Sequence, residues 1–258
     1  MSNTIFSMDE KVCLITGGSR GLGYAIAEAF FEAGAKRVYI TARKAEACEE
    51  AAKQLSKLGE CIAIPGDLSD VSEIDRLVSE LKQRETSIDV LVNNAGVGWL
   101  APLGEFPEKG WDKVMDLNVK TPFFLTQALR PLLINSASTD ATASVINIGS
   151  IAGIMGRTDT FSYAPAKAAV HQMTRNMAVE MAGDNIRVNA IAPGRFFTDM
   201  TKYASENSAM YEAEIKAIPL HRWGRDPDIK GIAVMLASPA GAFVTGQILA
   251  VDGGTSLV

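Results

Sequence analysis

The sequence predicts an α/β protein with a doubly wound parallel sheet of about seven strands and helices on both faces. Short, continuous apolar runs alternate with longer segments of helical periodicity. Continuous runs are typical of parallel strands that are buried on both faces. No internal repeat, charge block or low-complexity linker divides the 258 residues. Since α/β chains of this length often fold as one unit, we expect a single domain over residues 1–258.

Seven apolar runs are expected to form the strands of this sheet, with right-handed crossovers between them. They lie at residues 12–16, 38–42, 61–64, 90–92, 144–148, 187–191 and 248–251. The helical patterns lie near residues 22–34, 45–57, 71–84, 108–133, 162–182 and 227–237.

Three segments do not follow the alternation of strands and helices. The small polar residues 136–143 are expected to form the loop before the fifth strand, and the Gly- and Pro-rich residues 98–107 indicate another loop. Residues 198–224 form a long insertion before the last helix. Because long ordered insertions often cover functional sites, we expect a substrate lid there.

Composition and charge restrict the function classes. The net charge of −5 provides no overall basic field for a nucleic acid. Three cysteines without a Cys-x-x-Cys pair fit a reducing compartment. The first ten residues lack the features of a signal peptide, and no apolar run is long enough to predict a membrane span. We therefore expect a cytoplasmic protein without membrane or nucleic-acid partners, and the isolated His171 and His221 predict no metal site.

A glycine-rich turn follows the first predicted strand and opens the first predicted helix. Its sequence is Thr16-Gly17-Gly18-Ser19-Arg20-Gly21-Leu22-Gly23. The glycines at 17, 21 and 23 permit a tight turn and a close backbone approach to a diphosphate, which the N-terminus of a helix attracts. This spacing between a strand and a helix indicates a Rossmann-type dinucleotide site.

The second predicted strand leads into Arg43 and Lys44, where a unit specific for NAD would place a carboxylate. An arginine can bind a ribose 2′-phosphate through two parallel hydrogen bonds, whereas a carboxylate would repel it. Arg20 in the glycine turn is a second cation within reach. The sequence therefore predicts NADPH/NADP+ as the cofactor; the alternative is that Arg43 and Lys44 only begin a solvated helix.

Tyr163 and Lys167 stand four residues apart, and Ser150 precedes the tyrosine by thirteen residues. Reduction of a ketone requires a proton donor within hydrogen-bond reach of its oxygen. Residues four apart share a helix face, and we expect the Lys167 ammonium to lower the pKa of Tyr163. Ser150 can donate a hydrogen bond to the carbonyl oxygen. With the dinucleotide turn, these residues predict hydride transfer between a nicotinamide and a carbonyl; the alternative is ordinary packing of the tyrosine and solvation of the lysine.

With these motifs in order along the chain, the sequence resembles the short-chain dehydrogenase/reductase family over essentially its whole length. Further matching motifs are Gly66-Asp67-Leu68, Asn93-Asn94-Ala95-Gly96, Leu117-Asn118-Val119, Pro193-Gly194, Thr245-Gly246-Gln247 and Val251-Asp252-Gly253-Gly254. The resemblance implies a catalytic set of Asn118, Ser150, Tyr163 and Lys167. It implies cofactor contacts by Gly17, Ser19, Arg20, Gly21, Leu22, Gly23, Arg43, Asp67, Leu68, Asn94, Ala95, Gly96, Tyr163, Lys167, Pro193, Gly194, Phe196 and Thr198.

The resemblance also implies a role for each catalytic residue. Tyr163 would be the acid in reduction, and Ser150 would orient the carbonyl. Lys167 would hold the nicotinamide ribose, and Asn118 would fix a water that links Lys167 to solvent. For Asn118 the alternative is a residue at a helix kink, which does not exclude that role. Members of the family are usually tetramers, so the resemblance implies a homotetramer whose main interface uses the two longest predicted helices.

Within the family, the chain is most similar to 3-oxoacyl-[acyl-carrier-protein] reductases of the rhamnolipid-biosynthesis type, through residues 111–119, 145–153, 192–196 and 218–225. This resemblance implies a 3-oxoacyl thioester as the substrate, reduced to the 3-hydroxyacyl form. Apolar residues of the lid and of nearby loops could line an acyl site or simply pack the lid. They are Trp99, Met155, Phe161, Phe197, Met200, Tyr203, Met210, Tyr211, Ile215 and Ile218.

Other interpretations stay open from the sequence. Reductases of fatty-acid synthesis carry an arginine near the end of the helix after the Tyr/Lys pair, where this chain has Glu180-Met181-Ala182-Gly183-Asp184. Docking of an acyl carrier protein would then depend on Arg130 and Arg175, and a CoA thioester or a small free ketone is an alternative substrate. A second hypothesis is an NADP-dependent dehydrogenase of a polyol, sugar acid or other secondary alcohol. A third is a non-catalytic NADPH-binding regulator.

Overall fold

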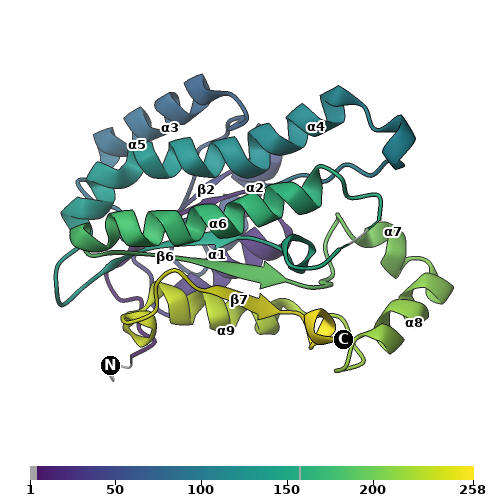
Figure 1. The fold of residues 1–258 in the computed structure, drawn as a ribbon. Helices are drawn as coiled ribbons and strands as arrows, with labels where there is room; N and C mark the ends of the chain where they lie inside the picture. Colours follow the sequence, from purple (N-terminus) through teal and green to yellow (C-terminus); the bar gives the residue numbers. More distant parts are fainter. Residues whose placement is uncertain (1–4, 157) are drawn as a thin grey trace.

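The computed structural model describes residues 5–156 and 158–258, so residues 1–4 and 157 of the predicted domain lie outside the described part. Seven strands form one parallel sheet in the order β3-β2-β1-β4-β5-β6-β7. The predicted fold class is confirmed (Figure 1). The strands are β1 (Val12–Thr16), β2 (Arg37–Thr41), β3 (Glu60–Ala63), β4 (Val90–Asn93), β5 (Ala143–Ile148), β6 (Ile186–Pro193) and β7 (Ile248–Val251).

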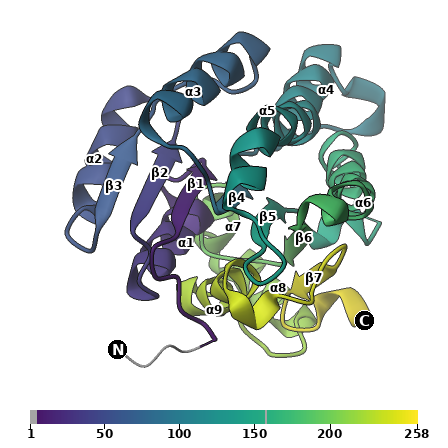
Figure 2. The same cartoon turned by 90° about the vertical axis from the view of Figure 1, so that its left-hand side faces the viewer.

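Helices cover both faces of the sheet, as the view along the strands shows (Figure 2). One core lies between the sheet and α1, α2 and α9; the other lies between the sheet and α3, α5 and α6. The helices are α1 (Gly21–Glu32), α2 (Ala45–Leu55), α3 (Val71–Arg84), α4 (Glu108–Met115), α5 (Thr121–Ser136), α6 (Tyr163–Met181), α7 (Lys202–Ser205), α8 (Ser208–Ala217) and α9 (Asp226–Ala237).

The central strands are apolar without alternation because both of their faces are covered. Every residue of β1, β4, β5 and β6 is buried. Helix α1 contributes alanines and two phenylalanines to one core, and small residues allow a helix to lie close to the sheet. Burial of this apolar surface is the main force that holds the layers together.

The long helix predicted near 108–133 is divided into three parts. Between α4 and α5 lies a five-residue π-helical segment, Asp116–Lys120. A period of 3.6 residues in the sequence does not reveal such a local widening. The predicted loop at 136–143 lies between α5 and β5, and the loop at 98–107 contains only a short 3-10 turn, Leu103–Glu105.

All seven strands are parallel, so the loops that follow them lie at one edge of the sheet. The predicted lid, residues 198–224, contains the two helices α7 and α8. Figure 1 shows the arrows of β6 and β7 directed toward the end of the molecule that carries α7 and α8. The lid therefore covers the edge where the predicted cofactor and catalytic residues follow their strands.

Candidate active site

The glycine-rich turn joins β1 to α1 at the carboxyl edge of the sheet. Gly17 and Gly21 have φ angles of +66° and +55°, a conformation that glycine adopts without steric cost. A Cβ on Gly17 would lie 2.9 Å from Asn94 Nδ2. Asn94 follows β4, and its Nδ2 donates to the carbonyl oxygens of Thr16 (2.8 Å) and Gly17 (3.0 Å). The predicted cofactor residue Asn94 thus braces the turn in its tight shape.

Thr16, which sequence reasoning passed over, ties the same two loops together. Its Oγ1 accepts hydrogen bonds from the backbone N–H groups of Asn94 (3.0 Å) and Ala95 (2.9 Å). The signal in the sequence is a hydroxyl residue at the end of a buried strand, directly before a glycine turn.

The two predicted phosphate-binding cations differ in their surroundings. Arg43 is exposed just after β2, and within the described ranges it takes part in no hydrogen bond or ion pair. Arg20 instead pairs with Asp199 of the lid, although both side chains are exposed. Thr198 also lies beside the turn, because its Cγ2 is 3.6 Å from the place of a Cβ on Gly21. The base of the lid therefore meets the turn that would hold a diphosphate.

Two further predicted cofactor residues follow β3. Asp67 is exposed, and its Oδ1 accepts hydrogen bonds from the backbone N–H and the hydroxyl of Ser69. Leu68 is buried, and its carbonyl oxygen accepts a hydrogen bond from Thr121 Oγ1 (2.5 Å). This loop is thereby fixed to the start of α5, while the Asp67 side chain is exposed to solvent.

The residues after β6 are held by their packing. A Cβ on Gly194 would lie 2.7 Å from the Cβ of Asp252, so only glycine fits. Phe196 is 3% exposed and its ring packs on Gly224. A cofactor can therefore contact the backbone of the predicted residue Phe196 but not its side chain.

Lys167 is buried in α6, one helical turn after Tyr163. Its Nζ donates to the carbonyl oxygen of Ile148 at 2.7 Å and lies 5.6 Å from the centre of the Tyr163 ring. Burial lowers the pKa of Lys167 to about 8, because the charged form loses hydration. An ammonium with three protons and one carbonyl partner keeps donors for further oxygen atoms.

Ser150 follows β5 and caps a 3-10 turn, Ile151–Gly153. Its Oγ accepts the N–H of Ala152 at 3.1 Å, and a side-chain hydrogen bond joins it to Tyr163. The serine and tyrosine hydroxyls are therefore adjacent, as needed for two groups that bind one carbonyl oxygen.

The pKa of Tyr163 is raised by burial, while the hydrogen bond with Ser150 and the positive charge of Arg195 lower it. The expectation that Lys167 lowers this pKa is wrong for this structure. The reason is that loss of hydration outweighs the opposing effects, and the lysine amine is directed at Ile148. A raised pKa keeps the phenol protonated at neutral pH, which suits a proton donor.

Asn118 lies within the π-helical segment Asp116–Lys120. Its Oδ1 accepts the N–H of Val97 at 2.9 Å, and its Nδ2 donates to the carbonyl oxygen of Val97 at 2.8 Å. A Cβ on Gly96 would lie 3.0 Å from Asn118 Oδ1 and 3.6 Å from Lys167 Nζ. Asn118 therefore stands both at an irregularity of the helix and beside the lysine, as the two non-exclusive hypotheses expected.

Sequence reasoning also missed an ion pair between the segment after β6 and the lid. Arg195 Nη2 lies 2.7 Å from Glu214 Oε1 of α8, and their side chains are 21% and 19% exposed. Arg195 directly follows Pro193-Gly194, and its charge acts on Tyr163. The arginine directly after the Pro-Gly motif was the signal in the sequence that could have indicated Arg195. Nothing in the sequence indicated Glu214, nineteen residues later, as its partner.

His171 is another residue to which the sequence assigned no role, and it is buried one turn beyond Lys167 in α6. Its Nε2 has no hydrogen-bond partner among the residues that the structure describes. The ring packs under the serine loop, since a Cβ on Gly149 would lie 2.8 Å from His171 Cδ2 and one on Gly153 would lie 2.9 Å from Cε1. Burial lowers the pKa of His171 to about 4, and the charges of Lys167 and Arg175 act in the same direction.

We expect His171 to make the protein sensitive to acid. Between pH 6.5 and 4 the unfolded chain binds a proton that the folded ring refuses, so stability rises with pH there and is lost on acidification. When the pH falls from 7.5 to 5, this group lowers the free energy of unfolding by about 2 kcal/mol. Urea unfolding of wild type and His171→Gln at both pH values measures it. Equal losses in the two proteins would contradict the assignment.

The lid has an aromatic core and an exposed apolar side. The rings of Phe197, Tyr211 and Trp223 lie 5.1 to 6.1 Å apart, and Ile218 packs with Trp223. Ile218 is thus a packing residue. The predicted acyl-site residues Phe197, Met200, Tyr203 and Met210 are between 41% and 50% exposed. Trp99 packs on Gly110, and Phe161 stacks edge-on with Phe106.

The sequence matches a known protein family and several known proteins. Residues 17–256 match the family model described as Enoyl-(Acyl carrier protein) reductase. The chain belongs to the short-chain dehydrogenase/reductase family. This confirms the resemblance expected from the motifs. Within that family it is 48% identical to the rhamnolipids biosynthesis 3-oxoacyl-[acyl-carrier-protein] reductase of Pseudomonas aeruginosa, over 98% of each chain. It is 39% identical to the 5-keto-D-gluconate 5-reductase of Escherichia coli, also over 98% of each.

Solved structures of short-chain dehydrogenases/reductases agree with the fold. The Pseudomonas aeruginosa RhlG/NADP active-site complex superposes with a TM-score of 0.95 at 47% identity, over 98% of each chain. A gluconate 5-dehydrogenase from Burkholderia cenocepacia, in complex with NADP and tartrate, gives 0.91 at 32% identity, again over 98% of each.

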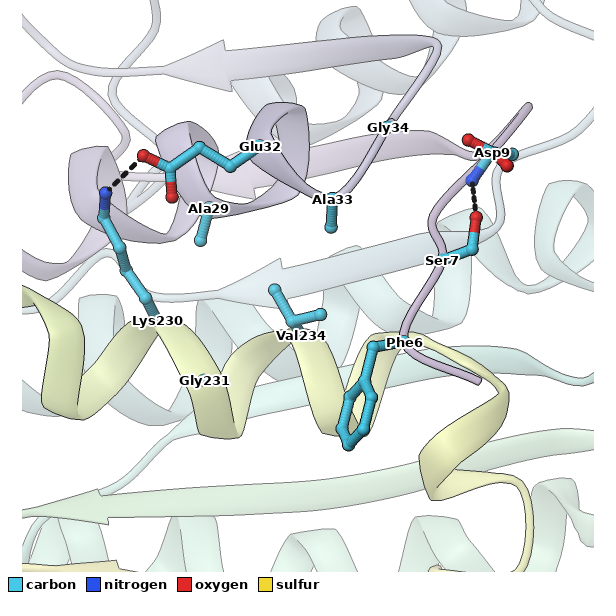
Figure 3. A pocket seen from close by; sticks show the side chains of 10 residues that line it. All are labelled: Phe6, Ser7, Asp9, Ala29, Glu32, Ala33, Gly34, Lys230, Gly231 and Val234. Atoms are coloured by element: carbon cyan, nitrogen blue, oxygen red, sulfur yellow. Dashed lines mark hydrogen bonds and ion pairs between the residues drawn. The ribbon is translucent and has the colours of Figure 1, made fainter. Parts of the chain in front are cut away.

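A separate surface pocket of about 620 Å³ lies between the N-terminal segment, α1 and α9 (Figure 3). It is lined by residues from the C-terminal half of α1, which lies toward the opposite edge of the sheet from the glycine turn. Its lysine, Lys230, is paired with Glu28 and Glu32. Because that charge is already neutralised and none of the catalytic residues lines the pocket, it is not the site of this chemistry.

Two further features concern the described residues alone. None of their helices combines the length and hydropathy needed to cross a membrane. No group of three or more His, Cys, Asp or Glu side chains among them is placed to hold a metal ion.

Proposed function

We propose that this short-chain dehydrogenase/reductase uses NADPH to reduce a 3-oxoacyl thioester to its 3-hydroxyacyl form. The observation that carries the proposal is the meeting of Tyr163, Ser150 and Lys167 at the carboxyl edge of the sheet, under a lid with exposed apolar side chains. The 48% identity with the 3-oxoacyl-[acyl-carrier-protein] reductase supports the substrate class.

The residues fit a bound dinucleotide. The turn after β1 is bare of side chains at Gly17 and Gly21, and Arg43 lies exposed where a 2′-phosphate would be held. When bound, the nicotinamide supplies the hydride. Lys167 would hold the ribose with the donors that Ile148 does not use, and Thr198 would face the carboxamide from the lid base.

Each catalytic residue then has one task. Ser150 and Tyr163 donate hydrogen bonds to the ketone oxygen, which positions the carbon and stabilises the charge that develops on the oxygen. Tyr163 gives up its proton to that oxygen. Lys167, with its pKa lowered to about 8, can return a proton toward the phenol. Asn118 would hold the water that connects Lys167 to solvent.

A steady-state assay of NADPH oxidation with acetoacetyl-CoA and with acetoacetyl-acyl carrier protein tests the proposal. We expect turnover of the CoA thioester at least. Of the two arginines expected to dock a carrier protein, Arg130 is already paired with Asp184 (2.7 Å) and Glu180 (3.7 Å), whereas Arg175 is exposed. Turnover of 5-ketogluconate with no turnover of either thioester would favour the second hypothesis, a sugar-acid dehydrogenase. No turnover of any carbonyl would favour the NADPH-binding regulator.

We expect Arg43→Ala to reduce the preference for NADPH. Removing a guanidinium from a phosphate costs about 1.5–3 kcal/mol, which corresponds to roughly a 10- to 100-fold loss in kcat/KM. The kcat/KM for NADH should change little, because NADH has no 2′-phosphate. Lys44→Ala is the matched control, since it removes the neighbouring charge. A wild-type preference for NADH, or equal losses with both cofactors in Arg43→Ala, would contradict the assignment.

A homotetramer in the cytoplasm stays a prediction. What supports assembly is the pattern of exposed apolar residues. Val179 on α6 is 81% exposed, and Phe243 after α9 is fully exposed. Single apolar residues on a surface are ordinary, but two so completely exposed on elements beside the sheet are consistent with coverage by another copy.

A further inference from the structure

We infer that Arg195 binds the second oxygen of the substrate, the thioester carbonyl, while Tyr163 and Ser150 bind the ketone oxygen. The inference rests on the proposed function and deepens it, because it names the residue that would distinguish a 3-oxoacyl thioester from a simple ketone.

The position of Arg195 is fixed from two sides. Its backbone carbonyl oxygen accepts the N–H of Gly224 at 2.8 Å, so the segment that leads into the lid is joined to the last residue of the lid. Its Nη2 is held by Glu214 Oε1 at 2.7 Å. A guanidinium carries five N–H donors in a rigid plane, and one carboxylate oxygen leaves several of them for a ligand. About a fifth of the side chain is exposed, so it is not closed off from a ligand.

The guanidinium belongs to a residue that follows β6, and β6 pairs with β5, the strand that leads to Ser150, with Ile191 beside Ile148. Its positive charge lowers the pKa of Tyr163, whose hydroxyl would bind the ketone oxygen. In a 3-oxoacyl thioester the two carbonyl carbons are separated by one methylene. A substrate held by Tyr163 and Ser150 therefore carries its second oxygen close to the first, within the region that the Arg195 charge reaches.

The charges of Arg195 and Glu214 favour a neutral oxygen of the substrate over a carboxylate. Glu214 balances the charge of Arg195, and its second oxygen, Oε2, is buried without a hydrogen-bond partner among the described residues. An unpaired carboxylate oxygen beside the guanidinium repels an anionic substrate group, such as the carboxylate of a sugar acid. A thioester carbonyl accepts a hydrogen bond without adding a second negative charge.

The test compares two substrates that differ only in this oxygen. One is acetoacetyl-CoA; the other is its thioether analogue, in which a methylene replaces the thioester carbonyl. We expect Arg195→Met to lower the ratio of kcat/KM values, thioester over thioether, by about 10- to 100-fold relative to wild type, the loss of one charge-assisted hydrogen bond. Arg195→Lys should recover part of the ratio. The effect of Arg195 on the pKa of Tyr163 acts on both substrates and cancels.

Arg222→Met is the matched control. It removes an arginine from the lid, which begins just after Arg195, and breaks a similar carboxylate pair, with Asp228 at 2.6 Å, without affecting Tyr163. Its ratio should equal that of wild type. If Arg195→Met does not fold, Arg195→Gln, which keeps two amide donors, enters the same comparison and should show a smaller fall in the ratio.

The outcomes separate this inference from the proposed function. If wild type reduces acetoacetyl-CoA but Arg195→Met loses rate equally on both substrates, Arg195 only positions the lid; the inference falls and the proposed function stands. If wild type reduces neither, or the thioether alone, the proposed function itself falls and the inference with it.

Discussion

Tyr163→Phe is expected to lower kcat for carbonyl reduction by about 10²- to 10⁴-fold, the contribution of one positioned general acid. The change removes a single hydroxyl from the first residue of α6 and leaves the ring in place. Ser150 should stay where it is, because the end of β5 and the turn that it caps hold it. Steady-state NADPH oxidation with acetoacetyl-CoA measures the loss, and the change in kcat should exceed that in the KM for NADPH.

Tyr24→Phe provides the matched control for Tyr163→Phe. It removes the same hydroxyl from α1, on the opposite face of the sheet, where the ring packs against the other core. Its kcat should lie within about twofold of wild type, because the hydroxyl that is removed lies on the face of the sheet opposite Tyr163. A Tyr163→Phe enzyme that keeps its rate would show that the proton comes from another group, and the proposed mechanism would have to be abandoned.

Lys167→Met is expected to lower kcat by about 10²- to 10³-fold, the usual effect of removing one group that stabilises charge in a closed site. It should nevertheless fold at least as well as wild type at pH 7. Burial holds the pKa of Lys167 at about 8, so the protonated amine disfavours the folded state at neutral pH. That cost is about 3 kcal/mol before the hydrogen bond to Ile148 is counted against it.

The pH dependence of stability distinguishes Lys167 from a merely structural residue. Between pH 8 and 10.5 the unfolded chain binds a proton that the folded amine has lost, so wild type gains stability from this group as pH rises. Lys167→Met should lack this gain. Urea unfolding midpoints of both proteins at pH 7 and pH 10 give the difference in stability between wild type and Lys167→Met at each pH. The contributions of the other titrating groups cancel in this difference. Lys36→Met, at an exposed pair with Glu10, should follow wild type. A constant difference between Lys167→Met and wild type would refute the lowered pKa.

The sheet could be predicted from the sequence because its central strands are buried on both faces and therefore lack alternation. The predicted bounds of β6 ended two residues early, since burial continues through Ala192 and Pro193 into the motif that follows. The catalytic trio could be found for a different reason. The reaction requires particular residue types at the positions of Tyr163, Lys167 and Ser150, and the spacing between these positions can be read directly from the sequence.

The lid could not be predicted in detail, because its helices lack the pattern that burial creates. Helix α8 has no fully buried residue, and only Tyr211 and Ile215, four residues apart, pack against the core of the lid. The pair of Arg195 and Glu214 depends on how the lid folds back, and nothing local in the sequence marks it. The direction of the Tyr163 pKa failed for a related reason, since the sequence names neighbouring charges but not the depth of burial that opposes them.

The ion pair between the glycine turn and the lid affects how the protein takes up ligands. Arg20 belongs to the turn that would receive a diphosphate, yet its guanidinium is engaged by Asp199 of the lid. A nucleotide that binds Arg20 must compete with Asp199. Nucleotide binding at the glycine turn and release of the lid from that turn are therefore thermodynamically linked. The linkage is reciprocal: whatever draws Asp199 away from Arg20 strengthens retention of the nucleotide by the same factor, and dissolved salt weakens the exposed pair.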